Sequence, residues 1–273
     1  MAVLSISKAW DETRDILARN GKLLTTVAAA MILLPQVVVG VVTGQAADTS
    51  SPGLSAGVLM LIAGLIGVVG QLAIARLALG TKVSVAESIG HGLRRAPAFI
   101  GSLLLILLGV IAFFLVAGAI LIGLGAIDGT VTEPRPRDVV IILLVLFIPM
   151  LIIAVRLFPT VPVATTEDQG PVGILTRSWA LTRGHFWRLL GFIAIFIIAA
   201  LVTAAAVGAV GGAIIALLFG IPEPFTLGAL VIALLMGLVQ AALVLVYVVM
   251  IARIYVQLAG DGAAEASVPT TGS

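Results

Sequence analysis

An arginine flanked by apolar residues recurs three times in the chain, each time within a similar four-residue motif. The motifs are Ile74-Ala75-Arg76-Leu77, Ala154-Val155-Arg156-Leu157 and Ile251-Ala252-Arg253-Ile254. A guanidinium group can form two parallel hydrogen bonds to a phosphate, so arginines in equivalent positions would suit the headgroups of anionic phospholipids. The alternative is that these arginines only anchor helix ends, with their alkyl stems in lipid and their charges at the water interface.

A second basic segment, rich in aromatic residues, follows the second motif. It contains Arg177, Arg183 and Arg188, and we expect these arginines to contact headgroups as well. Tryptophan is enriched at membrane–water interfaces, because its ring is apolar and its N–H is polar. The tryptophans that we expect to serve as interfacial anchors are Trp10, Trp179 and Trp187.

Residues suited to catalysis are few. The chain has no cysteine and only two histidines, His91 and His185, and neither lies in a metal-binding motif. Ser178 and His185 share a helical face but stand about 10 Å apart on a helix, beyond hydrogen-bond reach. The acidic pair Glu167-Asp168 is typical of a solvated turn. We therefore predict a protein without catalytic activity, metal or cofactor.

The composition and the length of the apolar runs predict which secondary-structure elements carry these residues. Of the 273 residues, 61% are hydrophobic and only 10% are charged, so much of the surface must face lipid. A helix needs about 20 apolar residues to cross a bilayer, and six continuous apolar runs meet that length. The sequence thus predicts an all-α polytopic membrane protein. Its runs are 23–42, 54–79, 98–124, 139–161, 189–219 and 225–258.

Each pair of spans follows an amphipathic basic segment, which predicts three repeated units of about 1–79, 80–163 and 164–259. In the first, Ile6, Trp10, Thr13 and Leu17 lie on one helical face. We expect such segments to form short cytoplasmic interfacial helices, each followed by a helical hairpin; the alternative is that they only extend the following span. The predicted bend points are Gly21, Pro97, Gly184 and Gly211-Gly212. We expect one domain over 1–259 and a disordered tail over 260–273.

Charge predicts the orientation. Thirteen of the fifteen lysines and arginines lie on one side of the predicted spans, and only Arg135 and Arg137 lie on the other. By the positive-inside rule, both termini are cytoplasmic, and we expect a multi-pass protein of the bacterial inner membrane. The net charge of +2 and the position of the basic residues beside spans favour lipid, and not nucleic acid, as the partner.

Small and polar residues within the spans indicate how the helices associate. Ala204, Gly208, Gly212 and Ala216 form a stripe that we expect to pack against another span of the same chain; self-association or a membrane-protein partner is the alternative. Polar residues of the spans include Gln36, Gln71 and Gln240. We expect Gln240 and Tyr247 to join helices and not to bind a ligand. The absence of acidic, lysine or histidine side chains near span centres disfavours an ion-driven pump.

One segment carries a family resemblance. It runs from Glu167 to Arg188 and resembles the membrane-domain family named after glycerophosphoryl diester phosphodiesterases. The matching positions are Glu167, Gly170, Pro171, Arg177, Ser178, Trp179, Leu181, Thr182, Gly184, Phe186, Trp187 and Arg188. The resemblance implies a stand-alone six-span membrane module, because the soluble phosphodiesterase barrel of some members has no counterpart in this sequence.

Three functions are compatible with these features. We expect a non-catalytic inner-membrane protein that binds or organises anionic phospholipid or a membrane partner. The alternative is a transporter or translocator of lipid or another small molecule, which a polar cavity between the hairpins would favour. A membrane phosphodiesterase is the weakest of the three.

Overall fold

The computed structural model describes residues 5–43, 53–79, 83–125, 136–220 and 223–266, and the regular elements in these ranges are all helices. Their order places three helical hairpins along the chain. The elements are α1 (Ile6–Ala28), the π-helical turn η1 (Ala29–Leu33), α2 (Leu34–Thr43), α3 (Leu54–Ala78), α4 (Val85–Gly123), α5 (Pro136–Arg156), α6 (Thr160–Thr166), α7 (Pro171–Leu181), α8 (Phe186–Phe219) and α9 (Leu227–Ala266).

Six helical segments are long and apolar enough to cross a membrane, which confirms the predicted all-α class and the number of spans. They are Ile6–Thr43, Leu54–Ala78, Val85–Gly123, Arg137–Thr166, Phe186–Phe219 and Leu227–Gly260. The predicted loops on the side opposite the three arginine motifs fall largely outside the described residues.

The amphipathic segments differ from one another. In the first two units they continue into the following span, since α1 runs through Gly21 and α4 runs through Pro97. Neither residue therefore ends its helix. In the third unit the predicted break is confirmed: α7 ends at Leu181, and Gly184 adopts a φ of +82°, a conformation that glycine tolerates without steric cost.

Three further boundaries correct the sequence analysis. Helix α8 continues through Gly211 and Gly212, so neither glycine interrupts it. Within the fourth span, helix α5 ends at Arg156 and the short α6 begins after Pro159, because a proline ring disfavours continuation of the preceding helix. Helix α9 extends to Ala266, past the predicted end of the domain at residue 259; residues 260–266 are rich in alanine, the strongest helix former.

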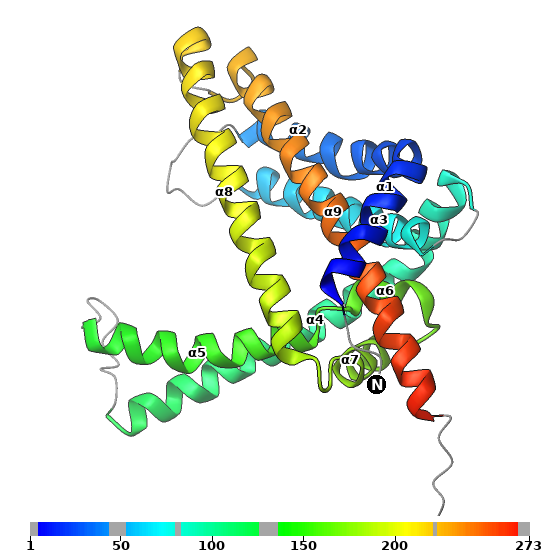
Figure 1. The fold of residues 1–273 in the computed structure, drawn as a ribbon. Coiled ribbons are helices and arrows are strands. Elements are labelled where there is room, and N and C mark those ends of the chain that lie inside the picture. Colours follow the sequence, from blue (N-terminus) through cyan, green and yellow to red (C-terminus); the bar gives the residue numbers. More distant parts are fainter. Residues whose placement is uncertain (1–4, 44–52, 80–82, 126–135, 221–222, 267–273) are drawn as a thin grey trace, which may run out of the picture.

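The buried core lies at one end of the hairpins. Its fully buried side chains come mainly from the second half of α3, from α6 and from the second half of α9, with Leu24 of α1, Ile174 of α7 and Leu189 of α8. Helix α6 packs against α3, α4, α7 and α9. From this centre the α4–α5 hairpin extends to the left and the α8–α9 pair to the top of Figure 1. The three arginine motifs lie on the helix ends that form this core.

Candidate functional site

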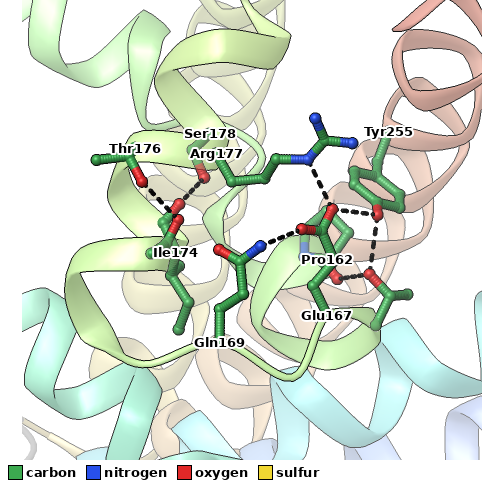
Figure 2. A network of polar contacts seen from close by, with 10 residues as sticks. Pro162, Glu167, Gln169, Ile174, Thr176, Arg177, Ser178 and Tyr255 are labelled. Carbon is green, nitrogen blue, oxygen red and sulfur yellow. Dashed lines mark hydrogen bonds and ion pairs between the residues drawn. The ribbon is translucent and has the colours of Figure 1, made fainter. Parts of the chain in front are cut away.

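The carboxylate of Glu167, beside this core, accepts hydrogen bonds from two helices and from the loop between α6 and α7 (Figure 2). Glu167 follows α6, and its Oε1 accepts hydrogen bonds from Arg177 Nε of α7 at 2.9 Å and from the Tyr255 hydroxyl of α9 at 3.0 Å. Its Oε2 accepts from Gln169 Nε2 at 2.9 Å. The Tyr255 oxygen in turn accepts from the Thr166 hydroxyl at 2.9 Å. The carboxylate therefore joins α6, α7 and α9 with both of its oxygens engaged.

This network corrects the expectation of a solvated acidic turn. Asp168 is solvated, with 96% of its side chain exposed, although it forms an ion pair with Arg95 of α4. Glu167 is only 19% exposed and acts as a structural acceptor. Its partner Arg177 lies ten residues further along the chain, on the next helix. A spacing of ten residues matches no helical repeat, so the ion pair could not be predicted from the sequence.

Arg76 of the first motif contacts His91 of α4. Its Nη1 lies 2.9 Å from His91 Nδ1, and His91 Nε2 lies 2.8 Å from the carbonyl oxygen of Thr165. Arginine can only donate and a carbonyl can only accept, so His91 carries its proton on Nε2 and is neutral in this arrangement. The sequence analysis did not identify this role, because the three residues are distant in the chain.

Arg253 of the third motif also has an internal partner. Its Nε donates to Glu12 Oε2 of α1 at 2.7 Å, and both side chains are largely buried. One turn further along α9, Gln257 Oε1 accepts from the backbone N–H of Ser5 at 3.1 Å. These contacts attach the beginning of α1 to the end of α9.

Arg156 of the second motif is arranged differently. Its guanidinium carbon lies 5.3 Å from the ring centroid of Trp179 and 6.0 Å from that of Phe186, both within cation–π range. Its Nε and Nη1 atoms are buried and find no hydrogen-bond acceptor in the described part of the chain. A buried donor without a partner costs about 1–3 kcal/mol, so this arginine has unused capacity for an anion.

An apolar groove begins beside Arg156. It has a volume of about 470 Å³ and lies between α4, α5 and α7. Trp179 belongs to this groove and also stacks on Arg156, so the charged group and the groove are neighbours. The other lining residues are Ile106, Gly109, Val110, Ile153, Leu157, Leu175 and Thr176.

The remaining predicted site residues lie apart from this arrangement. Arg183 and Arg188 are exposed, as are Trp10 and Trp187.

In the small-residue stripe, Gly208 faces Met236 of α9, whereas the space beside Gly212 is open and Ala216 is exposed. Gly211, outside the predicted stripe, faces Leu235 of α9. The contact between α8 and α9 thus uses glycines three residues apart.

Comparison with known proteins gives a family but no activity. The sequence matches DUF7847, a domain of unknown function, over residues 1–258. No curated protein and no solved structure matches the chain. Because the match spans nearly the whole sequence, the chain belongs to the DUF7847 family.

Proposed function

We propose that the protein is a non-catalytic, multi-pass protein of the bacterial inner membrane, with cytoplasmic termini, that binds an anionic phospholipid at Arg156. The observation that carries this proposal is the guanidinium of Arg156, which has buried N–H groups without an acceptor. A lipid phosphate would supply the missing acceptors through charge-assisted hydrogen bonds. One acyl chain would occupy the adjacent groove between α4, α5 and α7.

The arginines of the other two motifs differ from Arg156 in that they have partners within the chain. Arg76 and Arg253 already have partners in His91 and Glu12, so a headgroup would have to compete with an existing contact. The six predicted headgroup arginines therefore reduce to one principal site in the proposal. The resemblance to the phosphodiesterase membrane domains is compatible with lipid contact.

The test compares three proteins that differ in one arginine: wild type, Arg156→Gln and Arg253→Gln. Each is delipidated, and phosphatidylglycerol binding is titrated by native mass spectrometry. We expect Arg156→Gln to lose at least about tenfold in apparent affinity, since a hydrogen bond to a charged group contributes about 1.5–3 kcal/mol. Arg253→Gln should retain its affinity. Equal affinities in all three proteins would refute the proposal.

Translocation of lipid is a second candidate, because a cavity that contains three polar side chains lies between spans of different hairpins. Gln36, Gln71 and Gln240 line a space of about 260 Å³ between α2, α3 and α9. The test is the rate at which a fluorescent phospholipid changes leaflets in proteoliposomes. A rate equal to that of protein-free vesicles would exclude this function and leave lipid binding unaffected.

A further inference from the structure

The cavity between α2, α3 and α9 brings together three glutamines that are far apart in the sequence. Gln36 lies on α2, Gln71 on α3 and Gln240 on α9, and all three line one space of about 260 Å³. Liquid water of that volume would contain about eight or nine molecules. Gln36 and Gln240 are exposed and Gln71 is half-buried, so the cavity opens to the outside of the helices.

None of the three amide groups forms a hydrogen bond with another group in the described ranges, although each offers two donors and one acceptor. The expectation that Gln240 joins helices is therefore wrong. Polar groups in apolar surroundings normally find partners, because an unpaired amide is costly there. Three unpaired amides that converge on one space indicate that their partner is a ligand.

The backbone keeps this space open. Pro35 has no N–H, and in the turn before it the Leu34 N–H bonds to the carbonyl of Ala29, five residues earlier, which makes a π-helical turn. Such turns are rare and frequently occur at functional sites. On the opposite wall, Gly64 and Gly67 of α3 have open space where side chains would begin.

Close helix contacts fix the walls around the cavity. A Cβ atom at Gly70 of α3 would lie only 2.7 Å from the Cβ of Met31 in η1. A Cβ at Gly40 of α2 would lie 2.7 Å from the Cβ of Ala233 in α9. A Cβ at Gly237 of α9 would lie 2.9 Å from Leu33 Cδ1 in η1, so close contacts hold the helices that line the cavity.

We propose that this cavity binds an uncharged molecule that carries hydroxyl groups. The lining contains no charged side chain, so an ion would lack compensation in this environment. A purely apolar occupant would leave the amide groups unpaired. A hydroxyl both donates and accepts, as an amide does, and an ester carbonyl accepts from an amide N–H. Glycerol, with three hydroxyls, or a diacylglycerol, with one hydroxyl and two esters, can therefore offer each glutamine a partner. The source is either a diacylglycerol in the bilayer or free glycerol.

The experiment uses a thiol placed in the cavity, which is simple because the chain has no cysteine. Gly67→Cys is reconstituted in phosphatidylcholine nanodiscs, and its reaction rate with methyl methanethiosulfonate is measured. The probes are dioleoylglycerol in the nanodisc or glycerol in the buffer. Gly57→Cys, on the same helix but outside the cavity lining and also with open space, is the control for nonspecific slowing.

We expect at least a fivefold slower reaction at Gly67→Cys with one of the two probes, and no change at Gly57→Cys. Protection by dioleoylglycerol identifies a lipid ligand, and protection by glycerol identifies an aqueous one. In a Gln36→Leu, Gln71→Leu, Gln240→Leu background the protection should vanish, while the melting temperature stays equal or rises, because no internal hydrogen bond is lost. Absence of protection by both probes, or protection that persists without the glutamines, would overturn the proposal.

Discussion

Glu167 and Arg156 lie at the same end of the molecule, and both are charged and partly buried, but they differ in what surrounds their polar atoms. Glu167 accepts from Arg177, Tyr255 and Gln169. Arg156 stacks on two aromatic rings and has two buried nitrogen atoms without an acceptor. A polar group whose hydrogen-bond partners all come from the same chain stabilises the fold. A buried polar group without such partners is available to bind a ligand.

The same distinction separates two larger regions. The core around α6 contains the ion pairs of Glu167 and Glu12 and the His91 contacts, and these join α1, α3, α4, α6, α7 and α9. In the cavity, the side chains of Gln36, Gln71 and Gln240 form no hydrogen bond with any described residue. Substitutions in the first region should therefore change stability, and substitutions in the second should change binding with little effect on stability.

The largest effect is expected where backbones touch within the core. A Cβ at Gly92 of α4 would lie 2.7 Å from the backbone oxygen of Val69 in α3. Gly92→Ala should therefore destabilise the protein by about 1–3 kcal/mol, because backbone cannot move aside as a flexible side chain can. The measurement is the thermal midpoint from intrinsic fluorescence in detergent.

The matched control lies two residues away on the same helix. A Cβ at Gly90 would meet no described atom within 4 Å apart from its chain neighbours and the nearby backbone of α4 itself. Gly90→Ala should leave the midpoint unchanged or raise it, since alanine favours a helix by up to about 1 kcal/mol over glycine. Equal losses in the two variants would show that the α3–α4 contact is looser than the structure indicates.

The next largest effect is expected at Glu167, whose two carboxylate oxygens both accept hydrogen bonds. Glu167→Gln removes the charge opposite Arg177 and puts an N–H donor where Oε2 accepts from Gln169, and we expect a loss of about 2 kcal/mol in the free energy of unfolding. Asp168→Asn, next to it, should cost less than about 1 kcal/mol, because the Asp168 side chain is almost fully exposed. The thermal midpoints of the two variants decide the matter: if Asp168→Asn is the more damaging, the assignment of Glu167 as the structural acceptor is wrong.

A smaller effect is expected at the contact between α1 and α9. A double-mutant cycle with Glu12→Gln and Arg253→Gln should give a coupling energy of about 1 kcal/mol, because the pair is close but still partly solvated. The cycle is measured by thermal unfolding at low and high salt. A coupling near zero would mean that Arg253 is as available to a headgroup as Arg156, and the contrast between the two arginines would disappear.

The all-α class and the six spans could be predicted from sequence, because both depend on the length of continuous apolar runs. The break at Gly184 was also predictable, since a glycine between two helical patterns is a local signal. Pro97 gave a similar signal, yet α4 continues through it. Whether a helix continues through such a residue depends on tertiary packing, which local sequence does not encode.

The partners of the site residues could not be predicted for the same reason. The three arginine motifs look equivalent in sequence, but Arg76 meets a histidine, Arg253 a glutamate and Arg156 two aromatic rings. The glutamines were visible as polar residues within apolar runs. Their convergence depends on a π-helical turn and on glycine contacts between helices that are far apart in the chain.

The smallest effect concerns the ring on which Arg156 stacks. Trp179→Phe keeps an aromatic face but weakens the cation–π contact by about 0.5–1 kcal/mol, so the affinity for phosphatidylglycerol should change by about two- to fivefold. Trp187→Phe is the matched control, because Trp187 is 79% exposed and, among the described rings, Arg156 stacks on Trp179 and Phe186 instead. Native mass spectrometry of the two variants gives both affinities. If Trp179→Phe weakened binding as much as Arg156→Gln does, the groove and not the guanidinium would provide most of the affinity, and the lipid need not be anionic.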